Sequence, residues 1–259
     1  MGRPLAEQVA VVTGSTRGIG LAIATRLTEH GVTVVVNGRD PERVEVAVHA
    51  LGRRAYGVPA DVTTLAGTAR LAAEAAQRFG RVDLLVNNAG MAQAKPTLDV
   101  SIEEWQTCLD TNLTATFLCS QAFGRIMLGT AEKGIAAGGA IVNVSSMVGG
   151  VTGSPMRAAY AAAKAGVVAL TKVLAAEWGP AIRCNAVAPG YVETDMTALL
   201  DAEGRIDVEA IGRKTPMGRM AFPSEIADAV VLLASPAAAF VTGATLVVDG
   251  GFMVGAPWA

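Results

Sequence analysis

Short apolar runs alternate with longer Ala-rich stretches along the whole chain. The short runs, rich in Val and Ile, predict strands at residues 9–13, 32–36, 55–59, 82–87, 140–145, 182–187 and 245–248. The longer stretches predict amphipathic helices at residues 19–29, 41–51, 65–79, 102–128, 158–177 and 223–233. Strands that are apolar throughout and separated by helices indicate a parallel sheet with helices on both faces. With right-handed crossovers, this pattern predicts a Rossmann-type, doubly wound α/β fold.

The alternation continues without a linker or a break in composition, so we expect a single domain over residues 1–259. Residues 129–139 are rich in Gly and Ala and predict an exposed loop before a strand. Residues 190–215 form a longer irregular stretch after a predicted strand. Because ligands of open α/β sheets bind at the carboxyl ends of the strands, we expect this stretch to be a substrate loop that closes over the site.

Composition narrows the possible functions. The chain is 51% hydrophobic and 17% charged, which is sufficient for a large core. Its 21 basic and 23 acidic residues are spread without a basic run, so no nucleic-acid partner is expected. Every apolar stretch is interrupted short of the roughly 18 residues that a membrane span needs. The N-terminal residues lack the apolar segment of a signal peptide, so we expect a cytoplasmic protein.

Metal chemistry has few candidate ligands. Cys108, Cys119 and Cys184 lie far apart without a metal-ligand spacing, and we expect them to be small core residues. His30 and His49 fall near the ends of predicted helices, where surface histidines are common. No metal is therefore expected.

A glycine-rich turn follows the first predicted strand and precedes the first helix. It contains Gly14, Gly18 and Gly20, which permit a tight turn, a close approach to a pyrophosphate and close helix–strand packing. The unpaired N–H groups and the positive dipole end of the helix would face the phosphates. The cofactor-binding residues predicted here are Gly14, Ser15, Thr16, Arg17, Gly18, Ile19 and Gly20.

The end of the second strand should meet the adenosine ribose, where NAD-dependent enzymes usually place a carboxylate. This chain has Gly38 at that position, followed by Arg39. Arg39 and Arg17 could bind a 2′-phosphate, although both could also be solvated surface residues. We therefore expect a preference for NADP(H) over NAD(H). Asp61, with Val62, follows the third strand and is a candidate for contact with the adenine.

Tyr160 and Lys164 lie four residues apart and so share one helix face. A phenol with a pKa of about 10 is a poor proton shuttle near neutrality, and a nearby ammonium would lower its pKa. Ser146 ends a predicted strand and could donate a hydrogen bond to a substrate oxygen. Each of these residues alone has an ordinary structural interpretation.

Taken in order, the motifs resemble those of the short-chain dehydrogenase/reductase family. They are Thr13-Gly14-x-x-x-Gly18-x-Gly20, Asn87-Asn88-Ala89-Gly90, Asn112, Ser146, Tyr160-x-x-x-Lys164, Asn185 to Gly190, Glu193 to Met196, Val241-Thr242-Gly243 and Asp249-Gly250-Gly251. The resemblance covers nearly the whole chain and is closest to 3-oxoacyl-[acyl-carrier-protein] reductases and their paralogues. It implies an enzyme that reduces a carbonyl to a secondary alcohol, or the reverse.

The resemblance also implies site residues. Tyr160 would exchange the proton, Ser146 would orient the carbonyl, and Lys164 would bind the nicotinamide ribose and lower the tyrosine pKa. Asn112 would lie at a break in its long helix and hold a water linked to Lys164. The residues implied to line the cofactor are Asn88, Ala89, Gly90, Pro189, Gly190, Val192 and Thr194.

Two features depart from the family pattern. The stretch from Ser146 to Tyr160 is one residue longer than usual, which leaves Ser145 as the alternative serine. The basic residues on which an acidic carrier protein would dock are also absent. We therefore favour a small ketone, keto ester, sugar or polyol as substrate, with a carrier-bound 3-oxoacyl group as the alternative. The pocket residues expected are Met147, Val148, Pro155, Met156, Tyr191, Met196 and Leu199.

Other classes fit less well. A non-catalytic NADP(H)-binding regulator would be expected to lack one of the four catalytic residues, and all are present. An epimerase or dehydratase of the extended branch would have a differently spaced glycine turn and a larger substrate domain. Family relatives are commonly tetramers, so we expect a homotetramer or a homodimer.

Overall fold

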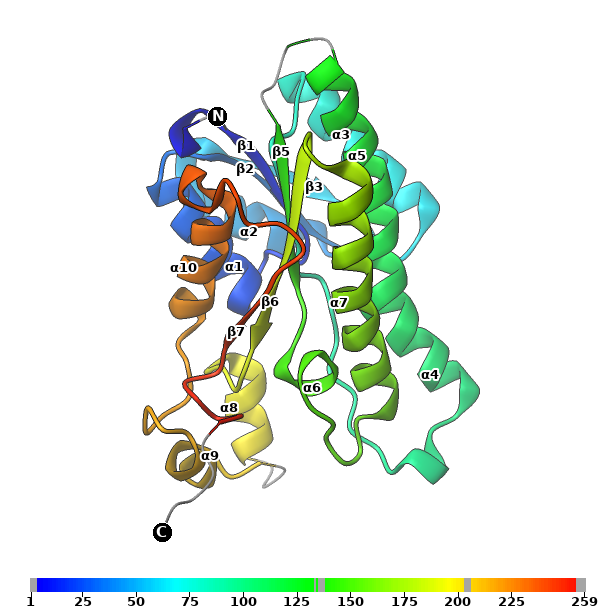
Figure 1. Ribbon diagram of the computed structural model, residues 1–259, viewed down its shortest axis with the longest axis vertical. Helices are drawn as coiled ribbons and strands as arrows, with labels where there is room; N and C mark the ends of the chain where they lie inside the picture. Colours follow the sequence, from blue (N-terminus) through cyan, green and yellow to red (C-terminus); the bar gives the residue numbers. More distant parts are fainter. Residues whose placement is uncertain (1–3, 133, 135–137, 203–205, 255–259) are drawn as a thin grey trace.

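The computed structural model describes residues 4–132, 134, 138–202 and 206–254. Its centre is a parallel seven-stranded sheet in the order β3-β2-β1-β4-β5-β6-β7 (Figure 1). The strands are β1 (Val9–Val12), β2 (Thr33–Gly38), β3 (Ala55–Pro59), β4 (Leu84–Asn87), β5 (Gly139–Val144), β6 (Ile182–Pro189) and β7 (Thr245–Val248). This confirms the predicted Rossmann-type fold, with strand ends that differ from the predicted ones by at most two residues.

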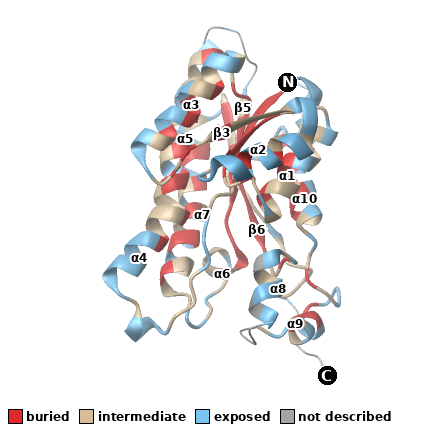
Figure 2. Cartoon of the chain, turned by 180° about the vertical axis from the view of Figure 1, so that it is seen from behind, coloured by how far each residue is buried: buried red, intermediate tan, exposed pale blue. Residues whose placement is uncertain are grey.

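Helices cover both faces of the sheet. One face carries α1 (Gly18–Glu29), α2 (Pro41–Leu51) and α10 (Pro223–Ala234), and the other carries α3 (Leu65–Phe79), α5 (Ala115–Glu132) and α7 (Ala158–Trp178) (Figure 1). Successive residues of β1 point to opposite faces, so Val12 packs in the same core cluster as Ile23 and Val11 in the same cluster as Phe123. The buried residues concentrate in the sheet and on the inner helix faces (Figure 2).

Local sequence signals explain where several helices begin. The Asp40 carboxylate accepts the amide hydrogens of Glu42 and Arg43 at the start of α2. Ser101 and Glu104 form a reciprocal capping box at the start of α4 (Ile102–Leu109). Such caps fix the direction in which each helix leaves the preceding loop.

The predicted helix over residues 102–128 is three consecutive segments. After α4 comes a π-helical turn, η4 (Asp110–Thr114), and then α5, which continues to Glu132. The break at Asn112 that the family resemblance implies therefore exists as a π-turn. The predicted loop over 129–139 is wrong at both ends, because Thr130 is a buried helical residue and Gly139 begins β5. Residues 133 and 135–137 of this prediction lie outside the described part of the chain.

The substrate loop expected at 190–215 contains two short helices, α8 (Asp195–Ala202) and α9 (Val208–Lys214). Both lie beyond the carboxyl ends of β6 and β7 (Figure 1). The Asp207 carboxylate accepts the Ala210 amide hydrogen at the start of α9. The other short helical segments described are η1 (Leu5–Glu7), η2 (Gly52–Arg54), η3 (Thr97–Asp99), α6 (Met147–Gly150) and η5 (Pro236–Ala238).

Among the described residues, α7 is the one helix whose length and composition would allow it to cross a membrane, with a mean hydropathy of 1.4. Core helices of globular proteins meet the same test, and Ala159, Ala163 and Val167 of α7 are buried inside the molecule. The three cysteines are buried, as expected. The described residues contain no group of three His, Cys, Asp or Glu side chains that could hold a metal ion.

Candidate active site

A cleft of about 860 Å³ opens at the carboxyl ends of the strands. One end is formed by the glycine turn and the end of β2, and the other by the start of α7 and the segment that follows β6. It brings together most of the residues predicted from the sequence: Gly14, Thr16, Arg17, Gly18, Ile19, Gly20, Arg39, Asp61, Val62, Asn88, Ala89, Gly90, Asn112, Ser146, Met147, Val148, Pro155, Met156, Tyr160, Lys164, Pro189, Gly190, Tyr191, Val192 and Thr194.

The glycine turn has the geometry that a pyrophosphate requires. Gly14 and Gly18 have positive φ angles of 62° and 54°. A Cβ at Gly14 would lie 2.9 Å from the Cα of Ala89, and one at Gly20 would collide with the Gly14 carbonyl oxygen and the Asn88 side chain. Helix α1 begins at Gly18 without a side-chain cap. Its first N–H groups are thus available to an anion, which fits a dinucleotide.

Buried polar side chains hold this turn against three strand ends. Thr13 Oγ1 accepts the amide hydrogens of Asn88 and Ala89, each at 3.0 Å, and Asn88 Nδ2 donates to the Thr13 and Gly14 carbonyl oxygens. On the other side, Asn37 Nδ2 donates to two carbonyl oxygens at the end of β3. The turn is therefore fixed by the fold before any ligand binds.

Ser15, which is predicted to bind the cofactor, is not among the residues that line the cleft. Its side chain is fully buried, donates to the Val12 carbonyl oxygen at 2.7 Å and accepts the Asn37 amide hydrogen at 3.0 Å. A serine hydroxyl that closes a strand-to-helix turn cannot reach into the cleft at the same time. Its role is to hold the turn.

The adenosine end of the cleft carries three arginines as well as Asp40 and Asp61. Arg17, Arg39 and Arg43 line it, and Arg43 is also paired with Asp40 at 3.3 Å. A Cβ at Gly38 would lie 2.7 Å from Thr16 Cγ2, so an acidic side chain fits there only if Thr16 moves. The position that often carries a carboxylate in NAD-dependent enzymes therefore has none here, and Thr16 would have to shift to admit one.

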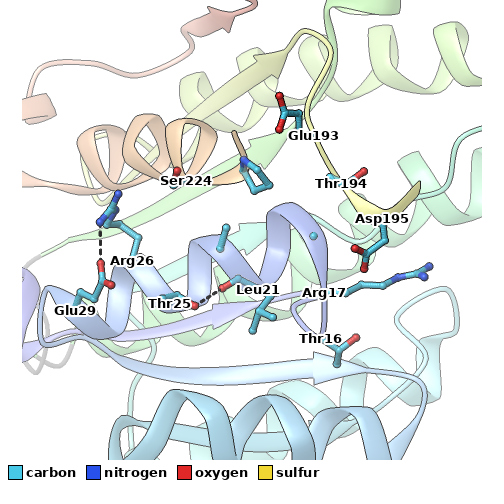
Figure 3. Close-up of a pocket in the computed structure, with 13 residues that line it drawn as sticks. Thr16, Arg17, Leu21, Thr25, Arg26, Glu29, Glu193, Thr194, Asp195 and Ser224 are labelled. Atoms are coloured by element: carbon cyan, nitrogen blue, oxygen red, sulfur yellow. Dashed lines mark hydrogen bonds and ion pairs between the residues drawn. The ribbon is translucent and has the colours of Figure 1, made fainter. Parts of the chain in front are cut away.

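A second hollow of about 610 Å³ continues from this end along the outer side of α1. Figure 3 shows Arg17 and Asp195 near each other at one end of it and the ion pair of Arg26 with Glu29 at the other. It shares Thr16, Arg17, Gly18, Thr194 and Asp195 with the main cleft. The hollow is thus an extension of the cleft rather than a separate site.

Tyr160 and Lys164 face the cleft from the first turns of α7. Lys164 is buried, and its Nζ donates to the Val144 carbonyl oxygen at 2.8 Å and lies 5.7 Å from the centre of the Tyr160 ring. Burial lowers the pKa of Lys164 to about 8. The ammonium is therefore held by the end of β5 immediately beside the phenol.

The pKa of Tyr160 differs from the expectation. Burial raises it above its ordinary value, while the Ser146 hydroxyl and the charge of Arg157 act to lower it. The expected net lowering by Lys164 is not found in the protein chain, because desolvation of the phenol outweighs the favourable interactions. A lower pKa of Tyr160 at neutral pH would therefore have to come from groups that bind beside the phenol.

The two candidate serines point in different directions. Ser145 Oγ donates to the Lys164 carbonyl oxygen at 3.0 Å, on the inner side of α7. Ser146 Oγ accepts the Val148 amide hydrogen at 3.1 Å and interacts with the phenol of Tyr160. This geometry favours Ser146 as the serine that shares a substrate oxygen with Tyr160.

Asn112 lies buried in the π-turn. Its Nδ2 donates to the carbonyl oxygens of Met91 and Cys108, both at 3.0 Å, and its Oδ1 accepts the Met91 amide hydrogen. A Cβ at Gly90 would lie 2.8 Å from Asn112 Oδ1 and 3.5 Å from Lys164 Nζ. Gly90 therefore allows Asn112 and Lys164 to approach the same point.

The substrate end of the cleft is mostly apolar. It is lined, as predicted, by Met147, Val148, Pro155, Met156 and Tyr191. The ring of Tyr191 makes an edge contact with the ring of Phe252, with 5.3 Å between the ring centres. Leu199, which was also predicted, is exposed and does not line the cleft. The side chain of Met196 lies outside the described part of the structure.

Sequence reasoning missed several residues that line the cleft: Asp40, Arg43, Thr63, Met91, Ala92, Ala94, Thr111, Ser154, Arg157, Thr197 and Ile206. Of these, Arg157 is the most informative because it carries a charge beside Tyr160. Its position three residues before Tyr160, at the start of the helix, is the sequence signal that could have identified it.

Comparison with known proteins agrees with this geometry. Residues 14–253 match a family model described as enoyl-(acyl carrier protein) reductase. Over 256 residues the chain is 43% identical to cis-4-hydroxycyclohexanecarboxylate dehydrogenase of Sinomonas cyclohexanicum, covering 97% of this chain and 99% of the relative. It is 40% identical to a 3-oxoacyl-[acyl-carrier-protein] reductase of Synechocystis sp., covering 96% and 98%. Among solved structures, an actinorhodin polyketide ketoreductase variant with NADPH superimposes with a TM-score of 0.88 at 37% identity, covering 97% and 99%.

Proposed function

Because this chain belongs to the short-chain dehydrogenase/reductase family, an oxidoreductase family acting on CH–OH groups, we propose that it interconverts a small ketone and its secondary alcohol with NADP(H). The observation that carries the proposal is that one cleft has residues suited to a dinucleotide at one end and residues suited to proton transfer at the other. The glycine turn can hold a dinucleotide at one end, and Tyr160, Ser146 and Lys164 meet at the other.

In the proposed reaction, the bound nicotinamide supplies the hydride for reduction or accepts it for oxidation. Tyr160 gives its phenolic proton to the substrate oxygen in reduction and takes it back in oxidation. Ser146 donates a hydrogen bond to the same oxygen, which helps most as negative charge develops there. Lys164 would hold the ribose of the cofactor, and Asn112 would hold a water through which the proton on Tyr160 is exchanged with solvent.

NADP(H) is proposed over NAD(H) because of the charges at the adenosine end. Arg17 and Arg39 offer guanidinium groups to a 2′-phosphate, and Gly38 supplies no carboxylate to repel one. A reductase of the carrier-protein type remains the alternative, supported by the similarity to the Synechocystis enzyme. We also retain the proposals of a cytoplasmic enzyme and a homotetramer or homodimer.

The test is a substrate panel with purified protein and either NADPH or NADH. It contains 4-oxocyclohexanecarboxylate, a neutral cyclic ketone, a keto ester, ketoses, the corresponding polyols and acetoacetyl carrier protein. Tyr160→Phe should lower kcat by about 10²- to 10⁴-fold on the best substrate, the range of general acid–base catalysis, and should leave cofactor binding intact.

Tyr56→Phe is the matched control, because Tyr56 packs against Phe79 away from the cleft. It should keep wild-type activity. Turnover by Tyr160→Phe at the wild-type rate would overturn the mechanism, and a strong preference for acetoacetyl carrier protein would replace the small-ketone proposal by the alternative.

A further inference from the structure

Arg157 is a charged side chain in an otherwise mostly apolar part of the cleft. Lys164 is the other charged residue beside Tyr160, and it is buried against the Val144 carbonyl oxygen. Arg157 is half-buried and lines the cleft. Its charge acts on the phenol of Tyr160, which lies three residues further along, in the first turn of α7.

The guanidinium of Arg157 has no counter-charge in the described part of the protein. The ion pairs found there join other cations to acids, and Lys95, whose amide group bonds to the neighbouring Met156, is paired with Glu104 at 2.7 Å. Arg157 makes one hydrogen bond among the described residues, from Nη1 to the Gln93 carbonyl oxygen at 2.9 Å. Most of its five N–H groups are left for another acceptor.

The backbone around Arg157 is fixed from two sides. Met156 has a positive φ of 64°, a conformation that is unfavourable for a residue with a Cβ. The Lys95 amide hydrogen is donated to the Met156 carbonyl oxygen at 2.9 Å, so residues 93–95 hold both Met156 and Arg157. The guanidinium is thereby directed by the fold, which lowers the entropy cost of binding an anion.

Helix α7 adds to the positive potential at this point. Arg157 is its N-cap residue and provides no side-chain cap, so the first N–H groups of a 21-residue helix stay unpaired by a side chain. A half-buried arginine and a helix N-terminus next to the proton donor form a place where one negative charge would be stabilised.

We propose that Arg157 is the anchor for a carboxylate on the substrate, so that the preferred substrate is a small keto acid or hydroxy acid. The carboxylate binds the guanidinium while an apolar spacer lies against Met147 and Met156 and the carbonyl reaches Tyr160 and Ser146. Planar, two-point recognition of a carboxylate is what the guanidinium geometry provides. The inference rests on the proposed function, because it names the substrate class of that site.

The experiment compares 4-oxocyclohexanecarboxylate with its methyl ester in the wild type, Arg157→Gln and Arg157→Lys. Glutamine keeps a donor for the Gln93 carbonyl oxygen but removes the charge, and lysine keeps the charge but removes the planar fork. We expect Arg157→Gln to raise KM for the acid by about 10- to 100-fold, the value of a lost charge-assisted hydrogen bond, with KM for the ester changed less than about 3-fold. The KM of Arg157→Lys for the acid should lie between those of the wild type and Arg157→Gln. Equal changes for acid and ester would overturn the proposal and assign Arg157 a structural role.

A binding measurement separates this inference from the proposed function. Cyclohexanecarboxylate has no ketone to reduce, and its binding to the protein can be followed by calorimetry in the presence of NADP⁺. Binding that is lost in Arg157→Gln supports the anchor even if none of the ketones is turned over. Equal binding by wild type and variant, or none by either, overturns it. Arg70→Gln, on the exposed side of α3, is the control and should bind as the wild type does.

Discussion

At the scale of single residues, Lys164 is the group in the site whose burial most disfavours the folded state. It is a buried lysine whose only hydrogen-bond acceptor among the described residues is the Val144 carbonyl oxygen. Burial lowers its pKa from 10.5 to about 8, and the charged form is therefore less stable in the folded chain than in the unfolded one. Such a difference is worth up to about 3 kcal/mol of unfolding free energy. The buried ammonium of Lys164, which lowers the stability of the fold, therefore lies where the proposed reaction uses it.

This predicts a particular pH dependence of stability. Below pH of about 8 both states hold the lysine proton, and the penalty is fully present. Between about pH 8 and 10.5 the unfolded chain still binds the proton and the folded chain does not, so stability rises with pH. Urea unfolding of wild type and Lys164→Met at pH 7, 8.5 and 10 should show the wild type gaining stability relative to the variant as pH rises.

Lys172→Met is the control, since Lys172 is exposed on the same helix. It should show no such pH-dependent difference from the wild type. A difference between wild type and Lys164→Met that stays constant from pH 7 to 10 would contradict the lowered pKa of Lys164.

Individual site residues differ in how far the sequence could identify them. Tyr160, Lys164, Ser146 and Asn112 were predicted because their types and order match a family, and the fold does bring them to one cleft. The direction of the Ser15 hydroxyl could not be predicted because its type and position suit a phosphate loop equally well, and only the buried bond to Val12 shows where it points. Arg157 was missed because an arginine near a helix start is usually solvated, and its significance depends on the absence of a counter-charge among the described residues.

At the scale of elements, the cofactor end is made by contacts between β2 and the turn that precedes α1. Gly38 ends β2, and a side chain there would press on Thr16 in the turn. Cofactor preference is therefore a property of two elements, because a carboxylate can be accommodated at the strand end only when the turn makes room.

We predict that Gly38→Asp alone lowers kcat/KM for both NADPH and NADH, since the introduced side chain would displace that of Thr16. Adding Thr16→Ala removes the obstructing methyl group. The double variant should lose at least about 10-fold in kcat/KM with NADPH, because of repulsion of the 2′-phosphate, and should use NADH better than the single variant does. Steady-state kinetics with each cofactor measures this, and Thr16→Ala alone is the control. An unchanged preference for NADPH in the double variant would contradict it.

The elements were predictable to different degrees. All seven strands and the long helices were found, because uninterrupted apolar runs and helical periodicity persist over many residues. The π-turn at Asp110–Thr114 has no periodicity of its own, and α8 and α9 are too short for a pattern and depend on local caps such as Asp207. Of these short segments, the π-turn and the start of α8 line the cleft.

At the scale of the whole molecule, several apolar side chains remain uncovered in one chain. Phe117 of α5 and Val173 of α7 are 43% and 51% exposed on the outer helical layer, and Phe240 and Val247 are exposed beside and on the edge strand β7. An edge strand with exposed apolar neighbours is unusual for a chain that stays alone. These surfaces support the proposal of a homotetramer.

Sedimentation velocity of the wild type should therefore show a species larger than one chain, with a tetramer as the main form. Phe117→Glu combined with Val173→Glu should reduce it to a smaller species, because two charges would be buried in each contact. Val46→Glu, an exposed apolar position on α2, is the control and should leave the assembly unchanged. Wild-type protein that sediments as a monomer would contradict the proposal.

The position of β1 in the sheet has a consequence for how the chain is made. β1 lies in the middle of the sheet, with Ala10 paired to Val34 of β2 on one side and to Leu84 of β4 on the other. During synthesis the first partner emerges soon after β1, whereas the second follows only after two further helices and β3. Until then an apolar strand edge stays open, with unpaired N–H and C=O groups that can pair with another nascent chain. The interval between residues 36 and 84 is thus one stage of translation at which a chaperone would protect this protein.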